Sequence, residues 1–246
     1  MAIATFKRFE RKFIVTKEQY ERMLPVILEK MVPDKYCTDG HSYPLMNLYF
    51  DNDTDQIIRH SVSKPKYKEK LRLRSYGTPK DGESTVYLEL KKKFYGTVTK
   101  RRVGMTLNEA YDYIYRGIRP EKRKYLPKQV LDEIDYFRAV TPCYPKIYIS
   151  YDRRAFFMKD KSDVRLTFDD NILTRRYDLD LMKGSYGEPL LKEGTMLLEI
   201  KVPDVIPLWL TELLSAEGVY MTSFSKYGKE YKTYVLGGKR TADGNE

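Results

Sequence analysis

The sequence predicts an α+β fold built on a mostly antiparallel sheet. Strand-like segments make up much of the chain, a few amphipathic helices lie among them, and the two kinds do not alternate regularly. Regular alternation is typical of parallel sheets, whereas this pattern favours an antiparallel sheet with helices packed against it. The 246 residues suffice for one large domain or two small ones, with a core that needs no disulfide or structural metal.

Helices are expected where capping residues precede apolar residues at helical spacing. Thr16 with Gln19, and Thr106 with Glu109, form two capping boxes, and Gly117 is expected to end the second helix. Proline at the first helical position and glycine after the last one mark other helices. On this basis we expect further helices from Pro127, from Pro207 to Gly218 and, in a shorter form, from Ser225 toward Tyr234.

Strands are expected where apolar and polar residues alternate or where β-branched and aromatic residues are dense. The expected strands are residues 6–15, 46–51, 66–76, 84–95, 98–105, 146–154, 163–169, 172–178 and 195–202. Glycine and proline between residues 77 and 82 predict a hairpin turn, and Gly96 predicts another.

Composition limits the chemistry. With 45 Lys and Arg against 35 Asp and Glu, the net charge of +10 favours an anionic partner. The chain has 2 cysteines and 2 histidines, which excludes a disulfide framework, a zinc ribbon and a multi-histidine centre. Any metal would be a hard cation such as Mg²⁺ or Mn²⁺ held by carboxylates.

No apolar run approaches the ~20 residues that span a bilayer, and the first residues lack the apolar stretch of a secretory signal. A cytoplasmic protein is therefore expected.

Side chains alternate across each expected strand, and one face repeatedly carries Arg and Lys with a Glu on several strands. Leu71 and Leu73 oppose Arg72 and Arg74, for example. An ordinary half-solvated sheet would explain any single strand. Strands curled into a barrel would instead gather these cations inside, where their repulsion requires a polyanion. Interior glutamates could then hold a divalent metal.

A sheet face that carries arginine and lysine side chains is suited to binding phosphate. Arginine offers planar, bidentate donors to phosphate oxygens, and lysine offers a mobile point charge. The sequence contains neither a GxxxxGK[ST] loop nor a GxGxxG loop. Phosphate binding would therefore depend on side chains rather than on backbone amides at the start of a helix.

Seven short motifs, in order along the chain, resemble the VTC domain. This is the polyphosphate polymerase domain of the vacuolar transporter chaperone complex, and it belongs to the triphosphate tunnel metalloenzyme superfamily together with the CYTH domains. The motifs are Glu10-Arg11-Lys12, residues 70–77 (KLRLRSYG), 88–91 (LELK), 151–156 (YDRRAF), 165–169 (RLTFD), 198–201 (LEIK) and 225–227 (SKY).

The resemblance implies a single domain over residues 1–246, with a core at about 6–235 and a flexible tail at 237–246. It implies a closed antiparallel β-barrel tunnel with helices packed on its outside. The tunnel would bind ATP and inorganic polyphosphate or triphosphate with Mn²⁺ or Mg²⁺, and the enzyme would transfer the terminal phosphoryl group of ATP to polyphosphate. Carried over from the motifs, the catalytic phosphate ligands are Lys12, Arg72, Arg74, Lys91, Arg153, Arg165 and Lys226, Tyr151 and Lys201 are further binding residues, and Glu199, Glu10 and Glu89 are metal ligands.

One departure from the superfamily affects the expected reaction. The usual Glu-x-Glu-x-Lys opening has Arg8 in place of its first carboxylate here, which favours the polymerase over a hydrolytic triphosphatase. A triphosphatase and a non-catalytic module that binds polyphosphate or nucleotide remain alternatives.

Nucleic acid is not the expected partner, because carboxylates between the cations would repel its backbone. No sensor or membrane domain is expected on either side of the motifs, which suggests a stand-alone prokaryotic version. Four arginines outside the motifs are interpreted as rim or solvent charges: Arg101, Arg102, Arg175 and Arg176. Lys100 and Arg102 are alternatively considered as additional ligands.

Overall fold

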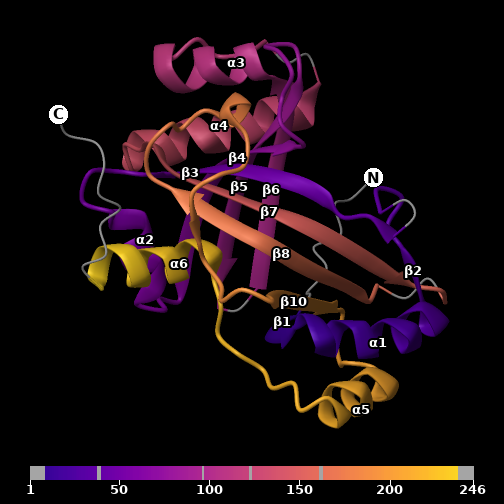
Figure 1. Cartoon of the computed structure of the whole chain (residues 1–246). Coiled ribbons are helices and arrows are strands. Elements are labelled where there is room, and N and C mark those ends of the chain that lie inside the picture. Colours follow the sequence, from indigo (N-terminus) through magenta and orange to yellow (C-terminus); the bar gives the residue numbers. More distant parts are fainter. Residues whose placement is uncertain (1–8, 38–39, 96, 122–123, 161–162, 238–246) are drawn as a thin grey trace. The chain divides into compact units, whose positions relative to one another are not determined.

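The computed structural model describes residues 9–37, 40–95, 97–121, 124–160 and 163–237 (Figure 1). Contacts between residues divide the chain into two compact units, which we describe separately. Unit 1 comprises Met1–Pro44, Tyr151–Ile172 and Pro189–Ser225, and unit 2 comprises Leu45–Ser150, Leu173–Glu188 and Lys226–Glu246. The expectation of a single domain stays a prediction.

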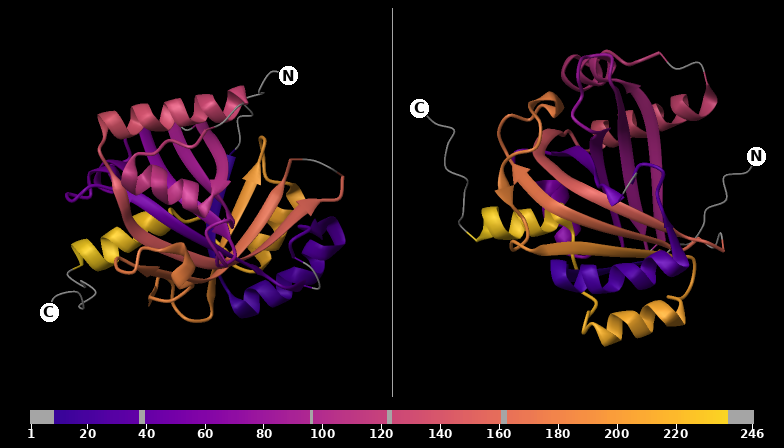
Figure 2. Two further views of the ribbon diagram at one scale, coloured as in Figure 1. Left: turned by 90° about the horizontal axis from the view of Figure 1, so that it is seen from above. Right: turned by 45° about the vertical axis from the view of Figure 1, so that its right-hand side comes forward.

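Unit 1 is a sheet with two helices packed on one face. Its strands follow the order β1-β10-β8-β7, β1 and β8 each pair antiparallel with β10, and β2 pairs with β7. Helices α1 and α5 lie on the same side of these strands (Figure 2). They share one buried apolar cluster with the strands, which includes Met23, Leu210, Phe168 and Leu198. The bounds are β1 (Phe9–Thr16), α1 (Lys17–Lys30), β2 (Met31–Pro33), β7 (Tyr144–Met158), β8 (Arg165–Arg175), β10 (Thr195–Val202) and α5 (Leu208–Ala216); β7 and β8 continue into unit 2.

Unit 2 is a second stretch of sheet with helices on its apolar face. Strands β3 to β6 pair in chain order, and β4 with β3 and β5, and β5 with β6, are antiparallel. Helix α4 crosses the strands (Figure 2). Its residues Leu131 and Ile134 share a buried cluster with Leu71, Leu73 and Leu88. The bounds are β3 (Tyr43–Asp51), α2 (Gln56–Val62), β4 (Tyr67–Tyr76), β5 (Thr85–Phe94), β6 (Thr97–Thr106), α3 (Leu107–Tyr111), η2 (Asp112–Arg116), α4 (Tyr125–Val140), η3 (Leu181–Lys183), β9 (Glu188–Pro189), α6 (Lys226–Glu230) and η4 (Tyr231–Leu236).

Both expected capping boxes are present. Thr16 accepts from the backbone of Gln19, whose side chain accepts from the backbone of Thr16, and Thr106 and Glu109 do the same. Gly117 ends the second helical segment in the left-handed region, at φ 72°, as expected from its lack of a Cβ. The prediction that Pro127 opens a helix was wrong by two residues. Helix α4 begins at Tyr125, and a proline is tolerated there because the amides of the first turn have no intrahelical partner.

Some strand predictions need correction. The segments 163–169 and 172–178 form one strand, β8, which ends at Arg175. Asn171 within it has φ 46°, a left-handed conformation that asparagine tolerates better than most residues. The polar residues around Asn171 hid the continuity of this strand in the sequence. Helix α2 and the short strand β2 were not predicted. Residues 6–8 of the first expected strand, Gly96 and the tail after Gly237 lie outside the described residues.

The α+β class with an antiparallel sheet is confirmed, but a closed barrel is not. In unit 1, the described part of β1 has β10 as its one strand neighbour, and in unit 2, β6 has β5 as its one strand neighbour. Among the described residues, no helix combines the length and apolar character needed to cross a bilayer.

The α5 helix offers a matched test of the core of unit 1. Leu210 is fully buried and Leu208 is 73% exposed on the same helix. We expect Leu210→Ala to lower the free energy of unfolding by about 2–5 kcal/mol, because it leaves a cavity. Leu208→Ala should change it by less than about 0.5 kcal/mol. Chemical denaturation measures both, and equal effects would contradict the assigned face of α5.

Candidate functional site

The charged face of unit 1 alternates acids and bases. In the ladder of β1 with β10, Glu10 lies opposite Lys201, and Lys12 lies opposite Glu199. On the neighbouring strand β8, Arg165 lies opposite Lys201. The apolar residues between these positions belong to the buried cluster under α1 and α5. The structure therefore brings five of the predicted site residues onto one face of the three strands β1, β10 and β8.

Lys12 lies between two carboxylates. Its Nζ is 3.0 Å from Oε1 of Glu10 and 3.3 Å from Oε1 of Glu199. Burial by itself would lower the pKa of Lys12, but the charges of Glu199 and Glu10 outweigh it, and the pKa is raised. The Nζ of Lys201 lies farther from Glu199, at 3.9 Å. Lys12 is thus a fixed ammonium group, and it holds the two carboxylates close to each other.

Arg153 forms the most buried ion pair of this unit's face. Its Nε and Nη2 donate to the two carboxylate oxygens of Asp169 at 2.6 and 2.7 Å, and Nη2 lies 3.9 Å from Oε2 of Glu199. Burial opposes the charge of Arg153, but Asp169 outweighs it and raises the pKa of the arginine. Arg154 instead lies over the ring of Tyr20 on α1. The choice of Arg153 over Arg154 thus agrees with the sides on which the two residues lie.

Two further predicted ligands of unit 1 have partners that the sequence did not indicate. Nη2 of Arg165 lies 3.4 Å from Oδ2 of Asp34, and its guanidinium lies 4.7 Å from the ring centre of Phe157. Tyr151 is buried, and the guanidinium carbon of Arg153 lies 5.2 Å from its ring centre. Their roles as phosphate ligands stay predictions.

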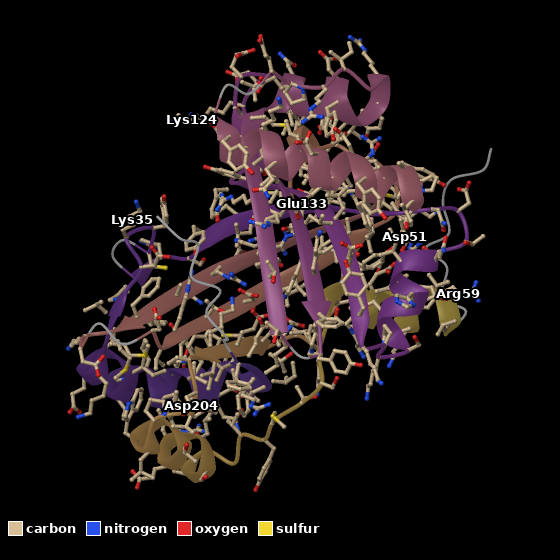
Figure 3. The ribbon with its side chains drawn as sticks, turned by 180° about the vertical axis from the view of Figure 1, so that it is seen from behind. Lys35, Asp51, Arg59, Lys124, Glu133 and Asp204 are labelled. Carbon is tan, nitrogen blue, oxygen red and sulfur yellow. The ribbon has the colours of Figure 1, made fainter. Side chains whose placement is uncertain are left out.

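The charged face of unit 2 lies on strands β4, β5 and β6 and is dominated by cations. The register sets three residues in each row: Lys70, Lys91 and Lys100 in one row, and Arg72, Glu89 and Arg102 in the next. The alternate residues of these strands, such as Leu71 and Leu88, pack under α4. Glu133 of α4 lies on that opposite side and pairs with Lys92 at 3.1 Å (Figure 3).

Glu89 is the centre of this face. Its side chain is 1% exposed, and its carboxylate lies 2.7 Å from Arg72, 3.3 Å from Lys100 and 3.7 Å from Arg102. Burial alone would raise the pKa of Glu89, but the charges of Arg72, Arg74 and Lys100 hold it well below its usual range. Burial also lowers the pKa of Lys100, which Glu89 only partly offsets. Glu89 therefore stays ionised and binds cationic side chains.

Arg72 and Arg74 are positioned by residues of β3 that the sequence did not single out. Nη1 of Arg72 donates to the hydroxyl of Tyr49 at 3.0 Å, and Nε of Arg74 donates to Oδ1 of Asn47 at 2.8 Å. Asn47 is fully buried and also donates to the carbonyl of Ile149. Burial would raise the pKa of Tyr49, but Arg72 and Arg74 outweigh it and lower the pKa. Only the register between strands brings these side chains together, so no local pattern could have revealed them.

Lys226 is buried at the start of α6, and its neighbours hold this helix in place. The hydroxyl of Tyr227 donates to Oδ2 of Asp51 at 2.7 Å. One turn later, Glu230 accepts from Nε and Nη2 of Arg176 at 2.7 and 3.0 Å. The prediction that Lys226 lies at the beginning of a helix is confirmed by the bounds of α6.

The interpretation of Arg175 as a rim or solvent charge was wrong, whereas Arg102, which was also considered as an additional ligand, lies on the cation face. Arg175 is 1% exposed, and it donates to the carbonyls of Asp178, Gly184 and Tyr186. Arg102 belongs to the Glu89 row, with its guanidinium 3.4 Å from the ring centre of Tyr87. These partners come from loops and neighbouring strands, which a single-strand pattern does not contain.

The two faces differ in charge balance. The unit 1 face groups four cations with four carboxylates, namely Lys12, Arg153, Arg165 and Lys201 with Glu10, Asp34, Asp169 and Glu199. On the described positions of the unit 2 face, eight cations meet one carboxylate, namely Lys68, Lys70, Arg72, Arg74, Lys91, Lys93, Lys100 and Arg102 with Glu89. The unit 2 face is therefore suited to an anion, whereas the unit 1 face can take either charge.

The predicted metal ligands do not form one cluster. Within the described part of the chain, no three His, Cys, Asp or Glu side chains gather in an arrangement that could hold a metal ion. Glu10 and Glu199 both approach Nζ of Lys12, so two carboxylates are available beside each other in unit 1. Glu89 belongs to unit 2, where its observed partners are cations. The metal assignment stays a prediction for all three.

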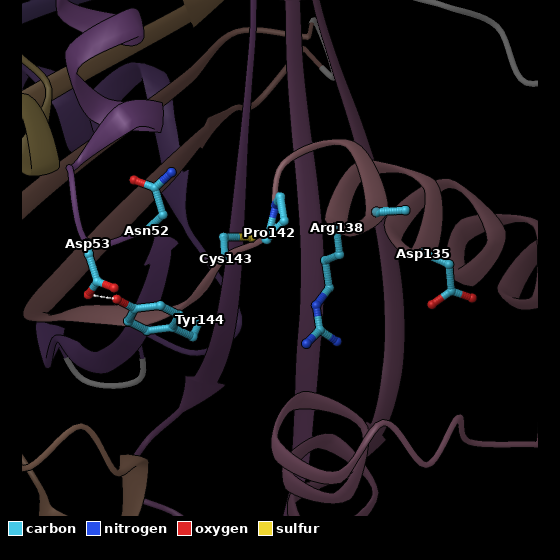
Figure 4. Close-up of a pocket in the computed structure, with 8 residues that line it drawn as sticks. Asn52, Asp53, Asp135, Arg138, Pro142, Cys143 and Tyr144 are labelled. Carbon is cyan, nitrogen blue, oxygen red and sulfur yellow. Dashed lines mark hydrogen bonds between the residues drawn. The ribbon is translucent and has the colours of Figure 1, made fainter.

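A hollow of about 690 Å³ lies elsewhere in unit 2 and contains none of the predicted ligands (Figure 4). Its wall includes the hydroxyl of Tyr144, which donates to Asp53. The lining residues are Asn52, Asp53, Asp135, Arg138, Ala139, Pro142, Cys143 and Tyr144. We assign it no role in phosphate binding.

The family model of the VTC domain matches residues 7–235. Because the match covers most of the chain, the protein belongs to the VTC domain family. No curated protein matches the chain.

The solved structures that resemble this chain are distant from it in sequence. A proposed adenylate cyclase from Bacillus halodurans is 15% identical with a TM-score of 0.54, and the match covers 89% of this chain and 95% of that one. A proposed adenylyl cyclase from Hippeastrum with a dominant triphosphatase activity is 14% identical with a TM-score of 0.47, over 95% and 97% of the two chains. At these identities, the likeness of the first shows the fold alone, and the second carries no argument.

The Glu89 network generates a pH prediction. Because the pKa of Glu89 is lower in the folded chain, its contribution is present above the unfolded value of about 4.3 and is lost as the pH falls further. We expect Glu89→Gln to cost about 3 kcal/mol at pH 7, since it leaves buried cations without their counter-charge. The variant should also lose less stability than the native chain between pH 5 and pH 3.

Denaturation at several pH values measures this, with Glu133→Gln as the matched control. Glu133 pairs with Lys92 and Arg101 on the helix side of the same sheet. An acid transition that is the same in Glu89→Gln as in the native chain would contradict the assignment of Glu89.

Proposed function

We propose that this protein is a polyphosphate polymerase-like phosphotransferase, which moves the terminal phosphoryl group of ATP onto inorganic polyphosphate with Mn²⁺ or Mg²⁺. The observation that carries the proposal is the face of unit 2, where eight cations share one side of the sheet with a single carboxylate at the described positions. Membership of the VTC domain family supports the same substrate class. The closed tunnel, the cytoplasmic location and the assignment of polyphosphate as the acceptor belong to this proposal.

In this proposal, the cations of unit 2 bind phosphate groups. Arg72 and Arg74 are held by Glu89, Tyr49 and Asn47, so the positions of their guanidinium groups are fixed before a ligand arrives. Fixed donors that neutralise phosphate charge are the main catalytic contribution of a protein to phosphoryl transfer. The proposal assigns phosphate binding here to Arg72, Arg74, Lys91 and Lys226, and in unit 1 to Lys12, Tyr151, Arg153, Arg165 and Lys201.

The reaction needs no side-chain nucleophile. A terminal oxygen of polyphosphate attacks the γ-phosphorus of ATP, a new P–O bond forms, and the bond to the β-phosphate oxygen breaks. ADP leaves with that oxygen, and polyphosphate is longer by one phosphoryl group. The cationic side chains bind and orient the two anions and reduce the repulsion between them.

Glu10 and Glu199 fit a divalent cation better than Glu89 does. Their oxygens lie within 3.3 Å of one ammonium group, so the pair already faces a common cation. A divalent metal beside them would complete its coordination with phosphate oxygens and water, and would neutralise further phosphate charge. Glu89 is instead held by Arg72 and Lys100, so in this proposal it positions cations.

Phosphate binding is testable by thermal stability. We expect tripolyphosphate to raise the melting temperature more than orthophosphate at matched ionic strength, because a chain of phosphates contacts several cations at once. A ligand that binds the folded chain stabilises it by RT ln(1 + [L]/Kd). The Arg72→Ala and Arg74→Ala variants should lose this preference. Equal shifts with both anions in the native chain would contradict the proposal.

The metal assignment is testable by turnover. Glu199→Gln retains the shape of the side chain but loses its charge, so we expect ATP turnover to fall by about 10²–10³-fold. Tripolyphosphate binding without metal should persist or become tighter, because a negative charge leaves the face. Arg72→Ala should instead weaken binding and turnover together. Near-native turnover of Glu199→Gln at limiting Mn²⁺ would contradict the assignment.

Incubation with ATP and Mn²⁺ identifies the reaction, provided polyphosphate, phosphate and ADP are measured separately. Polyphosphate with ADP supports the polymerase. Free phosphate without chain growth would replace the proposal by a triphosphatase. Binding without any product, with Mg²⁺ as well as Mn²⁺, would replace it by a binding module.

A further inference from the structure

The lysines of unit 2 extend beyond the residues that the family motifs identify. Past the rows of Arg72 and Lys70, the next row on the same face pairs Lys68 of β4 with Lys93 of β5. The third position of that row is Val98 of β6. Two successive rows therefore set lysines directly opposite lysines, and no position in either row carries a carboxylate.

Like charges directly opposite each other destabilise a sheet. Lys68 is half-buried and Lys93 is exposed. Burial and, after it, the charges of Lys93, Lys91 and Lys64 lower the pKa of Lys68. Its Nζ donates to the carbonyl of Ser61 at 2.8 Å, which gives a hydrogen bond but no counter-charge. The arrangement is thus costly in the absence of an anion.

On the opposite side of the same hairpin, carboxylates balance the charge of the lysine. Between Lys91 and Lys93 in sequence, Lys92 points to the helix side, where Nζ lies 3.5 Å from Glu69 and 3.1 Å from Glu133. Carboxylates therefore balance the lysine charge on one side of β5, whereas on the other side no described carboxylate forms an ion pair with Lys68 or Lys93.

We propose that Lys68 and Lys93 form an additional phosphate-binding site, which continues the cation face and takes a linear inorganic polyphosphate longer than triphosphate. The inference rests on the proposed function and adds chain-length preference to it. The rows from Arg74 to Lys68 span six residues of β4, or roughly 20 Å at the rise of an antiparallel strand. One short anion contacts part of this length, whereas a phosphate chain can follow all of it.

The test compares long-chain polyphosphate with tripolyphosphate as ligands, by calorimetry, in the full chain without ATP. The variant is Lys68→Gln with Lys93→Gln. The matched control is Lys92→Gln with Lys128→Gln, which removes the same charge from unit 2 away from this face; Lys128 is exposed on α4. Circular dichroism verifies that both variants fold, and Lys68→Arg with Lys93→Arg should restore binding because the charges return.

We expect the Lys68–Lys93 variant to weaken long-chain binding by about tenfold or more and to change tripolyphosphate binding by less than about twofold, since two charge-assisted contacts are lost from one ligand only. The salt dependence of long-chain binding should also become shallower, because fewer counterions are released. The control variant should leave the ratio of the two affinities unchanged.

Three outcomes overturn the inference: equal losses for both ligands, no loss for either, or a loss confined to single-stranded RNA in a parallel titration. Failure of the proposed function is separate and would be seen in the native chain as no affinity for either phosphate ligand. A native chain that makes polyphosphate, together with a Lys68–Lys93 variant of unchanged chain-length preference, would contradict this inference alone.

Discussion

The alternation of side chains along each strand is the constraint on which both units depend. It places Leu71, Leu73 and Leu88 under α4 while Arg72, Arg74 and Glu89 lie on the other side of the same strands. The apolar side provides the burial that stabilises the sheet. Because that side is secured by the helices, the opposite side can carry charges whose mutual repulsion would otherwise oppose folding.

Each unit limits this repulsion in a different way. In unit 1, acids and bases neutralise each other in direct pairs, of which Arg153 with Asp169 is the most buried. In unit 2, Glu89 binds Arg72, Lys100 and Arg102 together, and the remaining cations exceed the carboxylates. A face that stays positive after folding favours an anion, because ligand binding then relieves a strain that the fold already contains.

The sequence allowed the faces to be predicted, but not the networks on them. Alternation alone placed Lys12, Arg72 and Glu199 on charged faces, since a period of two is a local property. Asn47 and Asp169 were missed, because they meet Arg74 and Arg153, 27 and 16 residues away, only through the pairing of neighbouring strands. Arg175 was misassigned to the rim for a related reason, since its acceptors are loop carbonyls between residues 178 and 186.

Helix α6, near the end of the described chain, is held in place by buried polar contacts with distant parts of unit 2. Asp51 accepts from the backbone amides of Ile57 and Ile58 at the start of α2, and its Oδ2 also accepts from the hydroxyl of Tyr227. Arg176 links Glu230 of the same helix to Asp55. Helix α6 continues directly into η4, and a helical segment of residues 226–236 is still too short to be stable alone. These buried polar links therefore determine the position of Lys226, and the burial of this lysine depends on Asp51 and Arg176, which are distant from it in the sequence.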